Sequence, residues 1–277
     1  MTPPIERLRT RLERIGAPLC LGIDPHPDTL PAGLSPDAGG IEVFSRGLLE
    51  AAGDLACAVK VNVAFFEAFG SAGWAALERL RRDVPADLPI ILDAKRGDIG
   101  STAERQAVAL FGELQADGVT LSPYLGQDAI EPFLAYADRI VYVLARTSNP
   151  SAATLQDLPT RAGEQAVPLY QNVAEWVAGS WPEPRVGLVV GATAPEELAA
   201  LRRAVPGPAF LVPGVGAQGG DLASAVRACH GSQAPGLVNV SRGIAQASRG
   251  PNWRPAAAKA ARSMVEAMAE VGATLPA

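Results

Sequence analysis

Short apolar runs recur along this chain and alternate with longer amphipathic stretches. Eight of the runs are rich in Val, Ile and Leu and lack the polar alternation of a half-exposed strand, so we expect each to be a strand in a covered parallel sheet. The expected strands are Leu19–Ile23, Cys57–Val61, Pro89–Leu92, Val119–Leu121, Ile140–Leu144, Val186–Val190, Ala209–Val212 and Leu237–Val240.

A helix candidate follows each expected strand. These candidates are Ile41–Ala52, Trp74–Arg82, Ala103–Leu114, Ala129–Ala137, Gly163–Val177, Pro195–Ala204, Asp221–Ala228 and Pro255–Ala269. Eight strand–helix units in 277 residues predict an α/β fold, a (β/α)8 TIM barrel, with an open doubly wound sheet as the alternative. No shift in composition marks a linker, so residues 1–277 are expected to form a single domain.

Two segments fall outside the regular alternation. The first sixteen residues carry Arg and Glu throughout and predict an amphipathic N-terminal helix rather than a signal peptide. Thr147–Pro184 is rich in Ser, Pro and Thr ahead of its helix and predicts an enlarged loop after strand 5. Loops of this length are usually functional or mobile.

Composition narrows the class of protein. Hydrophobic residues make up 48% and charged residues 19% of the chain, which is typical of a packed enzyme. The net charge is −5 and no Lys/Arg block is dense enough to bind nucleic acid or a membrane surface. The three cysteines have no metal-type spacing, and no apolar stretch could span a bilayer, so we expect a cytoplasmic protein without disulfides.

Charged residues gather where the early strands end. Asp24 follows the first strand, Lys60 lies within the second, and Asp93, Lys95 and Asp98 follow the third. Strand geometry places Asp93 and Lys95 on one face. A lysine inside an apolar strand needs a carboxylate partner, and alternating charges keep both lysines protonated. This arrangement disfavours a Schiff-base lysine, which must be neutral to attack.

A glycine-rich segment, VPGVGAQGGD, follows the seventh strand. Its Gly214, Gly216 and Gly219 match a dinucleotide motif, but that motif belongs in a first strand–helix turn. Loops after strands 7 and 8 of barrels commonly bind phosphate, so a phosphate loop fits better. We expect the Gln218 amide and the Arg242 guanidinium to hold the phosphate oxygens.

These motifs together resemble those of the orotidine 5'-phosphate decarboxylase family. The resemblance rests on Lys60 in AVKVN, the spacing Asp93-x-Lys95-x-x-Asp98, PGVGAQGGD and VSRGI, and TSNP at 147–150 is similar to the larger-chain bacterial branch. It implies decarboxylation of orotidine 5'-phosphate to UMP in de novo pyrimidine synthesis, with no metal or organic cofactor.

The resemblance also implies a role for each catalytic residue. Lys95 would protonate C6, Asp93 would lie against the substrate carboxylate, and Lys60 would contact the ribose and Asp93. The family is a barrel homodimer, so Asp98, together with Ile99 and Thr102, would come from the partner subunit.

The remaining implied contacts bind the substrate. Asp24 would bind a ribose hydroxyl, and Gln218 and Arg242 would bind the phosphate. Ser148 would read the pyrimidine edge, with Thr147 or Asn149 as alternatives.

Two other functions are compatible with the same motifs. A hexulose-phosphate synthase or keto-gulonate-phosphate decarboxylase has a similar Asp-x-Lys-x-x-Asp pattern but uses Mg2+, so a chelator would inactivate it. A non-catalytic barrel could bind a phosphorylated nucleotide as a sensor, although it would have no use for two desolvated lysines.

Overall fold

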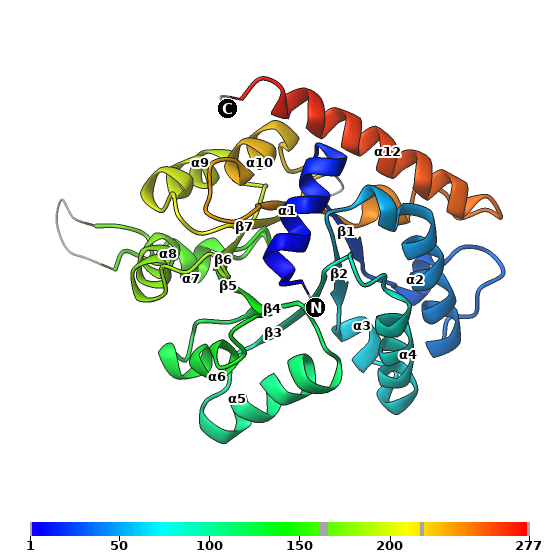
Figure 1. Ribbon diagram of the computed structural model, residues 1–277, viewed down its shortest axis with the longest axis horizontal. Coiled ribbons are helices and arrows are strands. Elements are labelled where there is room, and N and C mark those ends of the chain that lie inside the picture. The colour runs from blue at the N-terminus through cyan, green and yellow to red at the C-terminus, as the bar shows by residue number, and fades with distance from the viewer. Residues whose placement is uncertain (1, 161–165, 217–218, 276–277) are drawn as a thin grey trace.

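Eight parallel strands close into a barrel in the computed structural model, which describes residues 2–160, 166–216 and 219–275 (Figure 1). Each strand pairs with its neighbours in chain order, and β1 pairs with β8 to complete the ring. The strands are β1 Leu19–Ile23, β2 Ala58–Asn62, β3 Ile90–Arg96, β4 Gly118–Leu121, β5 Ile140–Arg146, β6 Val186–Val190, β7 Phe210–Pro213 and β8 Leu237–Val240. The prediction of a (β/α)8 barrel is confirmed.

Helices surround the barrel, and α12 closes their ring by packing between α10 and α2 (Figure 1). The longer helices are α2 Ala38–Ala52, α4 Gly70–Asp83, α5 Gly100–Ala107, α8 Leu169–Ser180, α9 Pro195–Ala204, α10 Leu222–Cys229 and α12 Trp253–Gly272. Single-turn helices are α3 Ala64–Glu67, α6 Glu131–Leu134, α7 Ala153–Gln156 and α11 Arg242–Ala245. Their apolar faces and the outer face of the barrel form the larger of two hydrophobic cores.

Several expected elements differ in extent from the structure, among them the third strand and two of the helices. The third strand does not end at Leu92 but continues to Arg96, so Asp93 and Lys95 belong to β3 itself. The helix expected over Ala129–Ala137 is reduced to the single turn α6. The helix expected from Gly163 begins at Leu169, directly after a proline, and residues 161–165 lie outside the described part of the chain.

The N-terminal helix α1, Pro4–Ile15, lies across one end of the barrel (Figure 1). Its Leu8 joins the inner core with apolar side chains of the strands, including Tyr142. The buried Arg11 donates hydrogen bonds to the carbonyls of Ala56, at 2.8 Å, and Gly53, at 2.6 Å. Because α1 closes the N-terminal ends of the strands, the opposite ends are left to form a pocket. No helix in the described part of the chain is both long and apolar enough to cross a lipid bilayer.

Candidate active site

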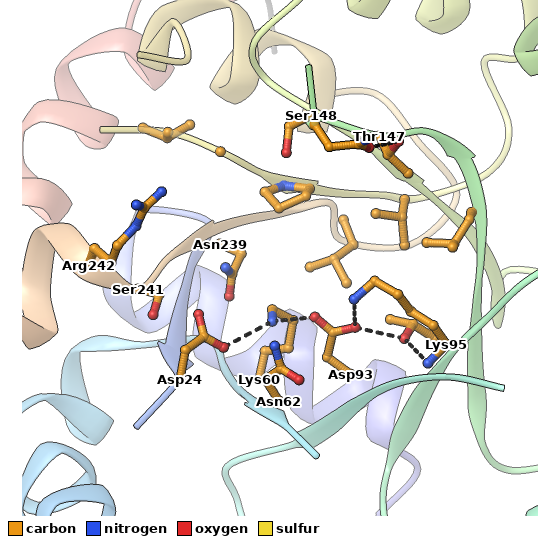
Figure 2. Close-up of a pocket in the computed structure, with 18 residues that line it drawn as sticks. Asp24, Lys60, Asn62, Asp93, Lys95, Thr147, Ser148, Asn239, Ser241 and Arg242 are labelled. Atoms are coloured by element: carbon orange, nitrogen blue, oxygen red, sulfur yellow. Dashed lines mark hydrogen bonds and ion pairs between the residues drawn. The ribbon is translucent and has the colours of Figure 1, made fainter. Parts of the chain in front are cut away.

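A cavity of about 410 Å3 opens at the C-terminal ends of the strands (Figure 2). Most of the strand ends contribute to it, as expected for the functional face of a barrel. Of the residues that the sequence singled out, those that line it are Asp24, Lys60, Asp93, Lys95, Ser148, Gly214 and Arg242. Residues from opposite ends of the chain therefore meet in one site.

Four charged side chains, Asp24, Lys60, Asp93 and Lys95, form a row in the cavity (Figure 2). Lys60 Nζ lies 2.7 Å from Asp93 Oδ2 and 3.9 Å from Asp24 Oδ1. Lys95 Nζ lies 2.5 Å from Asp93 Oδ1, so the Asp93 carboxylate bridges the two ammonium groups. The expected array of alternating charges is present.

Burial and charge oppose each other in this array. Burial disfavours the ammonium form of Lys60, but Asp24 and Asp93 outweigh that effect and raise its pKa above the ordinary value. Burial likewise favours a neutral Asp93, yet Lys60 and Lys95 hold the pKa of Asp93 well below its usual range. Both groups therefore stay ionised at neutral pH, which suits electrostatic rather than nucleophilic chemistry.

Three buried polar atoms around the cavity have no hydrogen-bond partner among the residues that the structure describes. They are Asp24 Oδ1, Asn239 Oδ1 and Ser241 Oγ, and all three residues line the cavity. A buried polar atom without a partner is costly, and a bound polar molecule would remove that cost. Two of these atoms can only accept a hydrogen bond, so they point to a ligand that carries donors such as hydroxyl groups.

The segment after β5 brings polar groups to the upper edge of the cavity, where Figure 2 shows Thr147 and Ser148. Gln156 of α7 accepts a hydrogen bond from the Thr147 N–H at 2.9 Å and donates one to Thr147 Oγ1 at 2.7 Å. The Thr147 hydroxyl in turn donates to Asn149 Oδ1 at 2.6 Å. Thr147, Ser148 and Asn149 all line the cavity, so each of the three predicted candidates is placed to contact a ligand.

Three glycines of the glycine-rich loop have backbone conformations that favour glycine. Gly214, Gly216 and Gly219 have φ values of 101°, 80° and 78°, a region that favours glycine. Gly214 and Arg242 both line the cavity, and Gly220 N–H donates to the Gly214 carbonyl at 3.1 Å. Gln218 lies outside the described residues.

Five of the predicted site residues that the structure describes do not line this cavity: Asp98, Ile99, Thr102, Gly216 and Gly219. Asp98 follows the end of β3, and its Oδ1 accepts a hydrogen bond from the N–H of Ile99 at 2.8 Å. Ile99 is half exposed and Thr102 is exposed on the first turn of α5.

Four polar lining residues were not among the predicted site residues: Asn62, Thr120, Asn239 and Ser241. Asn239 and Thr120 lie inside short apolar strands, where a single buried polar residue is the signal that could have found them. Among the described residues, no three His, Cys, Asp or Glu side chains gather as metal ligands would.

Comparisons with known proteins agree on one family. The family model described as "Orotidine 5'-phosphate decarboxylase / HUMPS family" matches residues 17–259. The orotidine 5'-phosphate decarboxylase of Roseiflexus castenholzii is 52% identical over 95% of this chain and 96% of its own length. That of Thermomicrobium roseum is 47% identical over 93% of this chain and 92% of its own. The structure of Leishmania donovani OMP decarboxylase superposes with a TM-score of 0.82 at 38% identity, covering 99% of this chain and 100% of that one.

Proposed function

This chain belongs to the orotidine 5'-phosphate decarboxylase / HUMPS family, and we propose that its pocket removes CO2 from C6 of the substrate by electrostatic stabilisation. The protein is a decarboxylase that converts orotidine 5'-phosphate to UMP in pyrimidine biosynthesis. The observation that carries the proposed mechanism is the carboxylate of Asp93, held between the ammonium groups of Lys60 and Lys95.

Lys95 is the proposed proton donor. When CO2 leaves, the electron pair of the broken bond stays on C6 in an orbital of the ring plane, where the ring cannot delocalise it. A preorganised cation next to C6 stabilises that charge as it develops, and such interactions are usually the largest contribution to catalysis. The Lys95 ammonium then transfers a proton to C6, which gives UMP and a neutral amine.

Asp93 and Lys60 provide the electrostatic environment for the loss of CO2 and the protonation of C6. The substrate carboxylate would lie against Asp93, so its charge is relieved when it departs as neutral CO2. Lys60, with only 5% of its side chain exposed, balances Asp93 and Asp24 and keeps both carboxylates in place.

The rest of the substrate is bound around this centre. Asp24 Oδ1, Asn239 Oδ1 and Ser241 Oγ, which lack hydrogen-bond partners among the described residues, suit the ribose hydroxyls. Arg242 and the glycine loop suit the phosphate, and Ser148 suits the pyrimidine edge. Binding energy at the distant phosphate can then be used to hold C6 against Lys95.

The activity is tested by following the orotate ultraviolet band of orotidine 5'-phosphate with purified protein in EDTA. We expect the band to disappear at the same rate with and without the chelator. A rate that EDTA abolishes would instead favour the magnesium-dependent enzymes of similar sequence pattern, and an unchanged band in both conditions would refute the assignment.

The proton donor is tested with Lys95→Ala. Since the phosphate and ribose contacts remain, we expect no turnover but UMP binding close to that of the original protein, measured by calorimetry. Turnover by this variant would mean that another group protonates C6.

A homodimer that shares its active sites is the second part of the proposal. Asp98, Ile99 and Thr102 would complete the pocket of the partner subunit. In support, Ile99 is 50% exposed and Tyr124 and Leu125, from the adjacent loop after β4, are 77% and 49% exposed. An exposed apolar patch of this kind is typical of a protein interface.

Subunit mixing tests this arrangement. Lys95→Ala and Asp98→Ala should each be inactive alone, whereas a heterodimer of the two contains one pocket with both residues intact. We expect mixing to restore up to about a quarter of the original activity if exchange is random, as counting the four possible pockets implies. No recovery after verified exchange would place Asp98 outside the partner's site.

The proposal extends to domain organisation and compartment. We place residues 1–277 in one barrel domain, supported by contacts such as α12 with α2. We place the protein in the cytoplasm, supported by three cysteines that are buried as free thiols. Cell fractionation would test the compartment.

A further inference from the structure

We infer that the hydroxyl of Thr120 is a positioning group that holds Asp93 and Lys95 in their reactive arrangement. The inference rests on the proposed roles of these two residues. Thr120 lies on β4, is only 2% exposed, and lines the cavity beneath them.

Two hydrogen bonds join Thr120 to the catalytic pair. The backbone N–H of Lys95 donates to Thr120 Oγ1 at 3.0 Å, and Thr120 Oγ1 lies 3.0 Å from Asp93 Oδ1. A carboxylate can only accept, so the hydroxyl proton must point to Asp93. One oxygen atom therefore fixes the backbone of the proton donor and the side chain of its neighbour.

The backbone of β3 explains why such an anchor is needed. Leu92 pairs with Val119 and Arg96 pairs with Leu121, so four steps along β3 match two along β4. The extra residues form a bulge, a feature that often re-aims side chains next to active sites. Lys95 has φ 46°, a left-handed conformation that residues with side chains rarely adopt. Its N–H bonds to a side chain of β4, and regular backbone pairing resumes where Ser122 N–H donates to the Arg96 carbonyl at 2.7 Å.

The hydroxyl has a particular value during turnover. Lys95 becomes neutral when it gives its proton to C6, so the ionic part of its attraction to Asp93 Oδ1 is lost and only a weaker hydrogen bond from the amine can remain. The hydrogen bond from Thr120 to that same oxygen does not depend on the charge of Lys95. Thr120 can therefore keep Asp93 oriented throughout the reaction, while the contacts to phosphate and ribose do not involve it.

Two matched pairs of side chains, Thr with Val and Ser with Ala, distinguish the effect of the hydroxyl from the effect of side-chain shape. Thr120→Val replaces the hydroxyl with a methyl group, and Thr120→Ala differs from Thr120→Ser only by lacking the hydroxyl. We expect Val and Ala to lower kcat by about 10- to 100-fold, as small misplacements of reacting groups do. We expect Ser to retain kcat within about threefold of the original, and UMP affinity to stay within about threefold in all three variants.

A merely structural role predicts a different order. Ser and Ala would then be the more impaired variants, because both remove a buried methyl group, and Val would be nearly normal. A kcat for Val close to the original, or equal losses for Ser and Ala, would overturn the inference. If Val does not fold, the Ser and Ala pair decides alone. Absence of decarboxylation in the unaltered protein would instead refute the proposed function.

Discussion

Replacing Lys60 with methionine should destabilise the protein strongly at neutral pH. Methionine has a similar length and fills the apolar part of the site, but it leaves Asp93 and Asp24 without their buried cation. Lys60 is 4% exposed and the Asp93 side chain is 12% exposed, so water can replace the lost charge only poorly. The variant tests whether the charge array is a balanced unit.

The magnitude follows from the distances. At an effective dielectric constant near 20, charges separated by 2.7 Å and 3.9 Å attract by about 6 and about 4 kcal/mol, for Asp93 and Asp24 respectively. Part of this loss is offset because methionine is uncharged, so the variant no longer bears the cost of burying the lysine ammonium group. Removing one partner of a buried ion pair commonly costs about 3–5 kcal/mol, and we expect a loss of free energy of unfolding in that range.

Urea unfolding at two pH values measures both the size of the loss in unfolding free energy and the direction in which that loss changes with pH. In the original protein the pKa of Asp93 is lowered, so its stabilisation is present at neutral pH and is lost as the pH falls through that low pKa. In the Lys60→Met variant the pKa of Asp93 should rise instead, so acid stabilises the variant. The difference between the two proteins should therefore shrink from pH 7 to pH 5.

A double variant serves as the control. Adding Asp93→Asn to Lys60→Met removes the uncompensated charge, so we expect it to recover part of the lost stability. Equal stability of Lys60→Met and the original protein, or a difference that does not change with pH, would refute the account of a charge-balanced core.

Four further outcomes follow from other contacts. Arg11→Met should lower the free energy of unfolding by about 2–4 kcal/mol in urea titrations, because it leaves two buried carbonyls without donors. The three buried cysteines, whose thiol pKa values burial raises to about 12, should resist iodoacetamide at pH 8 until the protein is unfolded. Arg242→Ala should weaken UMP binding by about 10- to 100-fold in calorimetry. Because the pKa of Asp93 is far below its usual range, kcat should stay within about twofold between pH 7 and pH 5; a steep fall centred near pH 5 would contradict this.

Much of the site could be predicted because barrel topology gathers the ends of parallel strands. Once eight strands were recognised, Asp24, Lys60 and Asp93 had to approach one another, although they lie far apart in the chain. Local sequence was enough here because burial on both faces leaves a clear apolar pattern in each strand.

The details of β3 could not be predicted in this way. Its bulge and the left-handed φ of Lys95 arise from pairing with β4, which no local pattern in the β3 segment encodes. Thr120 and Asn239 were overlooked for a related reason, since each is a single polar residue in a strand of four residues. The helix expected over Ala129–Ala137 was too long because propensity does not show where the barrel leaves room for only one turn.

The N-terminal helix has a consequence for the order in which the chain can fold. Helix α1 is synthesised before all eight strands, yet Arg9 Nη2 donates to the Gln233 carbonyl at 2.7 Å, across 224 positions of the chain. Leu8 likewise shares the inner core with Leu237 of the last strand. The docking surface of α1 is therefore complete only after β8 has been synthesised, and the apolar side of this helix stays open to chaperones until then.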